Sequence, residues 1–488
     1  MGKTLFNLTR KQLLVEVLAG LVVALALIPE AISFSILAGV DPKVGLFASF
    51  TMAVTISITG GRKAMISAAT GAIALVIAPL VSDYGLDYLI AAVILGGLLQ
   101  ILLAAIGVVK LMRFIPRSVM VGFVNALAIL IFSAQFPHII GKNISVWLLT
   151  ALGLIIIFTA PKIIKIIPAP LIAIVGLTSI TFFFGVQVPN VGDEGKLPSG
   201  FPVFALPNVP FDLTTFRIIF PYALGIAMVG LIESLLTAKL VDDITDTKSN
   251  KSRESFGQGI ANIVTGFFGG MGGCAMIGQT MINVKASGAR TRISTFLSGT
   301  FLLFLVVVAG SVISIIPMAS LVAVMIVVSY LTFDWHSIAP STLARMPKSE
   351  TFVMVCTVLV VVFTHNLAYG VIAGVFIEAV LFVRRVAHVV DVAGVIDEAT
   401  DTMKYKVTGE LFFASSNDLY YQFDYNVSTS KVEIDFTEAH VWDGSSVAAL
   451  DSITYKYASH GKEVEIIGMN KLSQRIHNKL SGNFPDSH

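Results

Sequence analysis

The sequence has few charged residues. Lys, Arg, Asp and Glu together make up 13% of its 488 residues, and 55% of the residues are hydrophobic, whereas soluble domains carry about 25% charged residues. A membrane is the solvent that fits this composition. The net charge is only +2, so no acidic or basic excess points to nucleic acid as a partner.

The sequence is also poor in cysteine. Cys274 and Cys356 lie in apolar or glycine-rich stretches and lack the spacing of a disulfide framework or a metal site, so we interpret both as free thiols. No Ser/His/Asp set, Cys/His metal spacing or phosphate-binding loop is visible in the sequence. The sequence therefore gives no support for an enzyme or for a bound cofactor.

Long hydrophobic runs are abundant before residue 390. About 20 apolar residues are needed to cross a hydrocarbon core about 30 Å thick, and fourteen candidate windows can be counted. The third and the tenth, near 68–82 and 276–286, are short and open with small residues, as expected of half-helices that begin from irregular backbone. The windows cover residues 13–37, 43–59, 68–82, 87–108, 117–137, 145–160, 169–187, 214–237, 255–270, 276–286, 293–315, 318–332, 351–367 and 369–388.

The positions of Lys and Arg predict the orientation of these spans, because cytoplasmic loops carry an excess of both residues. With the N-terminus inside, sixteen fall in inner loops and four in outer loops. We therefore predict an even number of spans, both termini in the cytoplasm, and a multi-pass protein of the inner (plasma) membrane. The sixteen are Arg62, Lys63, Lys110, Arg113, Arg117, Lys162, Lys165, Lys239, Lys248, Lys251, Arg253, Lys285, Arg290, Arg292, Arg345 and Lys348; the four are Lys43, Lys142, Lys196 and Arg217.

Seven spans followed by seven predict an inverted repeat, because an odd-numbered unit reverses its orientation when it is duplicated. The first and eighth spans each carry one mid-membrane glutamate, Glu30 and Glu233, and the two short spans occupy equivalent places in the halves. Short, glycine-interrupted segments at matching positions are the best sequence pointer to a substrate site. The predicted fold is an all-α membrane protein of fourteen spans arranged as a 7+7 inverted repeat.

The composition changes after Arg384 and Arg385, where charged residues return. Strand-like runs alternate there with helical stretches, which predicts a small α/β domain. We therefore divide the chain into a transmembrane domain, 1–389, and a cytoplasmic domain, 390–488. The expected strands are 404–407, 410–413, 432–436 and 464–467, and the expected helices are 445–459 and 471–480.

Glu30 and Glu233 are the sharpest chemical signal, because an ionised carboxylate at mid-bilayer costs at least about 3 kcal/mol on insertion scales. Two such acids close together need a bound cation or a proton, so we expect transport coupled to Na+ or H+. Thr237 lies one helical turn after Glu233, where its hydroxyl can join the carboxylate around Na+. The alternatives are glutamates that only hold helices together and a Thr237 hydroxyl bonded to its own helix backbone.

The half-helix openings supply charge of the opposite sign. Free N–H groups at a helix N-terminus carry about half a positive charge, and two facing ends suit a small inorganic anion. Close helix packing through small residues is the alternative interpretation. The predicted substrate-binding residues are Thr70, Gly71, Ala72, Ala275, Met276, Ile277 and Gly278.

Three segments carry a family resemblance: Pro29-Glu30, Glu233 to Thr237, and Asn283 to Ser294. They resemble the first-span signature, the acid-Ser-Leu-Leu-Thr motif of sodium-coupled bicarbonate members, and the end of the tenth helix in the SulP family of sulfate permeases and related anion transporters. At the position of Glu30 the family commonly has Gln, and at that of Glu233 the bicarbonate members have Asp. The tail resembles a STAS domain.

The resemblance implies a core domain that carries the anion between the third and tenth helices, a gate domain, and elevator-like motion within a homodimer. Met276 and Ile277 stand where sodium-coupled members have a small residue and a threonine, so Na+ and H+ both stay open as coupling ions. We expect a symporter of a small oxyanion, bicarbonate or sulfate. A dicarboxylate or nucleobase symporter of the same architecture and a passive anion channel are the alternatives.

Overall fold

The chain forms two compact units, Met1–Val375 and Phe376–His488. Residues 110, 113 and 165 of the predicted inner loops, the ends of two predicted spans at 108 and 388, and residue 389 at the predicted domain boundary lie outside the described residues. The computed structural model describes residues 9–107, 115–163, 169–364, 366–387 and 390–482.

The first unit is built of helices, and each of the fourteen predicted windows contains one. In the part of the chain that the structure describes, six helical segments are long and apolar enough to cross a membrane; the number of spans and their orientation remain predictions. The six contain α1 (Arg10–Leu37), α2 (Pro42–Thr59), α4 (Leu86–Ile106), α5 (Arg117–Ser133), α6 (Ile144–Ile163) and α8 (Leu213–Thr245). The other helices are α3 (Gly71–Tyr84), α7 (Ala169–Phe184), α9 (Lys251–Phe267), α10 (Ile277–Met281), α11 (Arg292–Val308), α12 (Gly310–Ser314), α13 (Met318–Thr332), α14 (Pro340–Arg345), α15 (Lys348–Thr364) and α16 (Leu367–Ala387), the last of which continues into the second unit.

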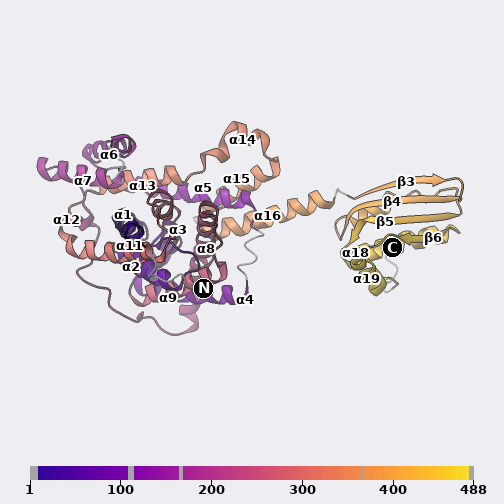
Figure 1. Ribbon diagram of the computed structural model, residues 1–488, viewed down its shortest axis with the longest axis horizontal. Coiled ribbons are helices and arrows are strands. Elements are labelled where there is room, and N and C mark those ends of the chain that lie inside the picture. Colours follow the sequence, from indigo (N-terminus) through magenta and orange to yellow (C-terminus); the bar gives the residue numbers. More distant parts are fainter. Residues whose placement is uncertain (1–8, 108–114, 164–168, 365, 388–389, 483–488) are drawn as a thin grey trace. The chain divides into compact units, whose positions relative to one another are not determined.

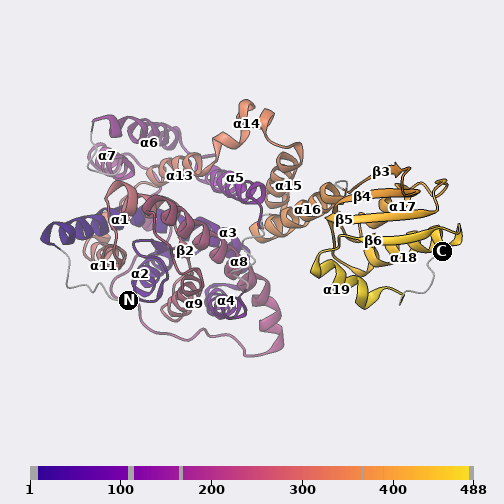
Figure 2. The same cartoon turned by 45° about the vertical axis from the view of Figure 1, so that its right-hand side comes forward.

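The helices of this unit pack in two groups (Figures 1 and 2). One group contains α1 to α4 with α8, α9 and α11, and the other contains α5, α6, α7, α13 and α15. Contacts of α1 with α13 and of α3 with α5 join the groups. Both short helices that were predicted as half-helices, α3 and α10, contact members of the first group.

Small residues allow the closest helix pairs of the first group. A Cβ added at Gly97 on α4 would lie 2.6 Å from the carbonyl oxygen of Gly259 on α9, and one added at Gly259 would lie 2.7 Å from the carbonyl oxygen of Gly97. Helices associate in lipid through such backbone approach, since burial of apolar surface gives no advantage there.

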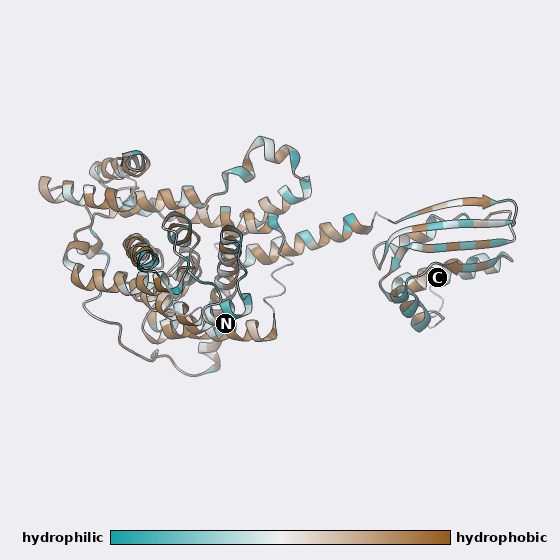
Figure 3. Ribbon diagram, viewed as in Figure 1, coloured by the Kyte–Doolittle hydropathy of each residue, from teal (hydrophilic) through white to brown (hydrophobic). Residues whose placement is uncertain are grey.

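These helices consist mostly of hydrophobic residues (Figure 3), and several large apolar side chains are exposed. Phe183 on α7 and Phe363 on α15 are each 80% exposed, and Phe304 on α11 is 64% exposed. Soluble proteins rarely present contiguous apolar surface of this kind. The surface therefore fits a hydrocarbon environment.

A polar cluster holds the turn between α2 and the strand that follows it. The Glu254 carboxylate, at the start of α9, accepts hydrogen bonds from the N–H groups of Gly61 (2.7 Å) and Arg62 (2.9 Å). The Arg62 guanidinium donates to Asp242 near the end of α8 at 3.0 Å. Burial lowers the pKa of Arg62, and the Asp242 charge opposes that shift. These contacts tie the turn to both helices.

The second unit contains a four-stranded sheet in the order β3-β4-β5-β6. β3 pairs antiparallel with β4, and β4, β5 and β6 run parallel. Alternate residues of β5, such as Val432, Ile434 and Phe436, are buried together with Leu450 and Tyr457 of α18. The elements are β3 (Asp391–Asp397), β4 (Thr402–Leu411), α17 (Ser416–Tyr421), β5 (Lys431–Val441), α18 (Gly444–Ser459), β6 (Glu463–Ile467) and α19 (Lys471–Leu480).

One prediction for this unit was wrong in detail, and one strand was missed. The strand expected at 410–413 is not separate, because β4 continues to Leu411. β3 was not predicted; five of its seven residues are exposed, so it lacks the alternation that marks a half-buried strand.

Candidate functional site

Two short strands bring the half-helices together. β1 (Ser67–Ala68) pairs antiparallel with β2 (Cys274–Ala275), so that Ala68 faces Cys274. β1 lies just before α3 and β2 just before α10. Segments about 200 residues apart in the sequence therefore meet at one point, and the first turns of two helices begin beside them.

The two helix starts are built differently. Thr70 is the N-cap of α3, and its hydroxyl oxygen accepts from the N–H of Ile73 at 3.4 Å. Gly71 and Ala72, both buried, follow as the first helical residues, and their N–H groups have no partner within the helix.

The start of α10 leaves its first N–H groups equally free. Met276 is the N-cap and makes no side-chain cap; Ile277 and Gly278 follow it. Gly278 is exposed, and nothing lies within 4 Å of a Cβ added there. The helix continues as one π-helical turn, Ile282–Ala286.

Buried side chains hold the backbone that leads into α10. Asn262 clamps Gly273 from both sides: its Nδ2 donates to the carbonyl oxygen at 3.1 Å and its Oδ1 accepts from the N–H at 2.9 Å. The N–H of Ala275 donates to the hydroxyl of Ser234 at 3.1 Å. The Thr280 hydroxyl accepts from the N–H of Ile66, just before β1, at 3.0 Å. Irregular backbone at membrane depth must be satisfied inside the protein in this way.

Glu233 lies beside the strand pair. The thiol of Cys274 donates to its Oε2 at 2.7 Å, and the same sulfur lies 3.1 Å from the Thr70 hydroxyl oxygen. Cys274 and Thr70 are buried, while Glu233 is partly exposed. The structure therefore brings the acid of α8 and the cap of α3 to one thiol.

Thr237 does not contact the carboxylate of Glu233. Its hydroxyl donates to the main-chain carbonyl oxygen of Glu233 at 2.7 Å, which is the backbone-bonded alternative considered from the sequence. The hydroxyl oxygen retains acceptor capacity.

Glu30 contacts the second half-helix. Its Oε1 accepts from the side-chain amide of Gln279, the third residue of α10, at 2.9 Å. Glu30 and Glu233 therefore both reach the segment 274–279, one through Gln279 and the other through Cys274. Sequence reasoning missed Gln279, although a glutamine inside a short apolar half-helix was a signal that could have been followed.

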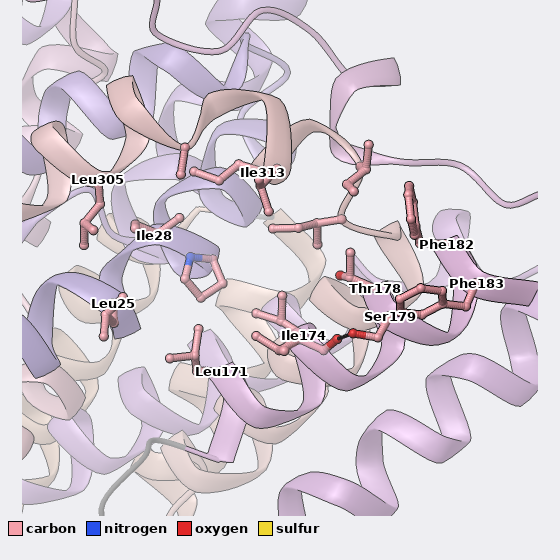
Figure 4. A pocket seen from close by; sticks show the side chains of 16 residues that line it. Leu25, Ile28, Leu171, Ile174, Thr178, Ser179, Phe182, Phe183, Leu305 and Ile313 are labelled. Carbon is pink, nitrogen blue, oxygen red and sulfur yellow. Dashed lines mark hydrogen bonds between the residues drawn. The ribbon is translucent and has the colours of Figure 1, made fainter.

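A cavity of about 390 Å3 lies on another side of α1 (Figure 4). Leu25 and Ile28 of α1 face Ile174 of α7 and Ile313 of α12 across it. Its lining is apolar and includes none of the predicted substrate-binding residues. The cavity suits hydrocarbon and not an inorganic anion.

Comparison with known proteins decides the family. The model of the sulfate permease family matches residues 13–146 and 142–357, and that of the STAS domain matches residues 394–482. The chain belongs to the sulfate permease family.

The relatives of this family member include transporters named for two anions. It is 52% identical over 96% of both chains to a Bacillus subtilis (strain 168) protein named "Putative sulfate transporter YbaR". Its fold resembles the transmembrane domain of a cyanobacterial bicarbonate transporter, BicA, with a TM-score of 0.67 and 25% identity, over 75% of this chain and 98% of that one. It also resembles murine Slc26a9, an anion transporter, in the inward-facing state, with a TM-score of 0.81 and 17% identity, over 97% of this chain and 88% of that one.

Proposed function

We propose that this protein is a secondary active transporter that imports a small inorganic oxyanion, bicarbonate or sulfate, across the inner membrane. The observation that carries the proposal is the antiparallel pairing of β1 with β2, which joins the segments that lead into α3 and α10. The anion lies between them, at Thr70, Gly71 and Ala72 on one side and at residues 275–278 on the other. Free N–H groups of both first turns supply the positive charge.

The two acids carry the coupling cation. Glu233 is hydrogen-bonded to Cys274 and Glu30 to Gln279, and each contact leaves one carboxylate oxygen for a further ligand. A proton on either acid, or Na+ held by Glu233 and the Thr237 oxygen, offsets the cost of an acid at membrane depth. Moving an anion and a cation through the membrane together costs less electrostatic free energy than moving either ion alone.

The movement is an elevator-like displacement of the first helix group against the second. The strand pair and its side-chain clamps join α3 and α10 to α8 and α9, so the site moves as one body. The homodimer and the cytoplasmic location of both termini belong to the same proposal.

Uptake by purified protein in liposomes tests the function. Labelled bicarbonate, sulfate and succinate are compared with and without an inward Na+ gradient or an inward proton gradient. We expect one of the two oxyanions to accumulate under one of the gradients. Accumulation of succinate would favour the dicarboxylate alternative. Uptake that does not depend on either gradient would favour a channel.

A further inference from the structure

One buried polar atom of the site has no partner. The side chain of Gln279 is 2% exposed, and its Nε2 donates to Glu30 Oε1. Its Oε1 is buried and accepts no hydrogen bond from the described residues. Buried side-chain oxygens are nearly always paired in native proteins, so this oxygen is available to accept from a ligand.

A donor for this oxygen belongs at the two helix starts. Glu30 and Phe34 are one helical turn apart and share a face of α1. Phe34 lies against the start of α3, because its Cε1 would be 2.8 Å from a Cβ added at Gly71. Glu30 reaches the start of α10 through Gln279. This face of α1 therefore spans both ends of the proposed anion site.

The side-chain groups on this face are acceptors. When it is ionised, the carboxylate of Glu30 only accepts, and the free Oε1 of Gln279 accepts whatever the charge on Glu30. The predicted substrate-binding residues include no Lys or Arg, so positive charge comes from backbone N–H groups alone. A fully deprotonated divalent anion placed here would meet two acceptors and little compensating charge.

We infer that the Glu30–Gln279 pair selects a monovalent oxyanion that carries its own O–H donor, such as bicarbonate, over a bare oxyanion such as sulfate. The inference rests on the proposed function and narrows its substrate class. Bicarbonate presents deprotonated oxygens to the helix N–H groups and its O–H to Gln279 Oε1. Sites built to bond a substrate O–H reject analogues that lack it, because their own polar group is then left unpaired.

Nitrate separates the effect of the donor from the effect of charge. It is planar and singly charged like bicarbonate but has no hydrogen to donate. We therefore measure how strongly unlabelled bicarbonate, nitrate and sulfate inhibit the uptake of labelled bicarbonate at one fixed pH. The comparison of nitrate with bicarbonate gives the effect of the donor, and the comparison of sulfate with nitrate gives the effect of charge. We expect nitrate to inhibit about 10-fold to 100-fold more weakly than bicarbonate, as for one unpaired buried acceptor, and sulfate more weakly still.

Two variants test the role of the pair. Gln279→Met removes the unpaired oxygen and keeps a similar side-chain volume. Bicarbonate and nitrate should then inhibit uptake about equally. Glu30→Gln introduces an amide N–H of the protein that can donate to Gln279 Oε1. The difference in inhibition between bicarbonate and nitrate should therefore also become smaller. The second variant keeps a test available if the first fails to fold. Cys356→Ala, on α15, is the control and should leave the ranking unchanged.

The outcomes separate the two proposals. Wild-type protein that takes up neither bicarbonate nor sulfate removes the proposed function and this inference with it. If the wild-type protein takes up an oxyanion and bicarbonate and nitrate inhibit that uptake equally, the inference alone is overturned. The same holds if a folded Gln279→Met variant keeps the wild-type difference in inhibition between the two anions. Sulfate preferred over bicarbonate would also overturn the inference.

Discussion

The thiol of Cys274 links Glu233 to Thr70. Its sulfur lies 2.7 Å from the carboxylate oxygen of Glu233 and 3.1 Å from the hydroxyl oxygen of Thr70. Because the Thr70 oxygen also accepts from Ile73 N–H, its own hydrogen is free for the sulfur. The proposed cation and anion sites therefore share one side chain.

Glu233→Gln should abolish gradient-driven uptake while the protein still inserts. The amide keeps the shape of the side chain but removes the negative charge that the proposed coupling cation requires. Glu30→Gln is the comparison variant; it introduces the residue common in the family and should impair gradient-driven uptake less than Glu233→Gln does. Uptake of the labelled oxyanion in liposomes under each gradient gives the measurement. Wild-type rates in Glu233→Gln would remove Glu233 from the coupling mechanism.

Cys274 should react slowly with a charged thiol reagent. The residue is 0% exposed, and its thiol is hydrogen-bonded to Glu233. In a Cys356→Ala background, labelling should be at least about 10-fold slower in the folded protein than after denaturation, since exposed and buried thiols differ in access. Mass spectrometry over time measures it. Fast labelling of the folded protein would show that the strand pair opens readily.

Gly273→Ala should disrupt the strand pair. An added Cβ would lie against the carbonyl oxygen of Ala68 and 2.7 Å from its carbonyl carbon, and backbone cannot give way as a flexible side chain can. Overpacking of this kind costs about 1–3 kcal/mol, which should lower the thermal midpoint in detergent. Gly278→Ala is the control, since open space surrounds that position. An unchanged midpoint in Gly273→Ala would contradict the close approach of the strands.

Asp443→Ala should destabilise the tail unit. Its carboxylate caps α18 by accepting from Ser446 N–H at 3.0 Å, and it also accepts from Phe413 N–H at 2.7 Å. Loss of an N-cap costs about 0.5–2 kcal/mol, so the urea midpoint of the tail unit should fall. Asp443→Asn retains an oxygen for the cap and should lose less. If Asp443→Ala and Asp443→Asn have the same urea midpoint, the cap contributes nothing to stability.

The helices of the first unit could be predicted because lipid-facing and buried residues are both apolar. Hydropathy alone predicted the ends of these helices less accurately. α8 continues to Thr245, eight residues past its predicted end, through the polar segment that holds Asp242. The window at 293–315 is divided into α11 and α12 around Ala309, and no proline marks the break.

The site could be predicted only in part. Small residues at 70–72 and 272–275 pointed to the helix starts, because their composition is local. The partners of Glu30 and Glu233 could not be found in the same way, since Gln279 is 249 residues from Glu30. Strands of two residues, such as β1 and β2, have no periodicity to read.

The pairing of β1 with β2 constrains what can change during a transport cycle. Two facing residue pairs bond the entrance of α3 to the entrance of α10, so displacement of one entrance displaces the other equally. The distance between the two sets of N–H groups then stays constant. Under the proposed function, we therefore expect the same intrinsic affinity for the anion on both sides of the membrane, with direction set by concentrations and the coupled gradient.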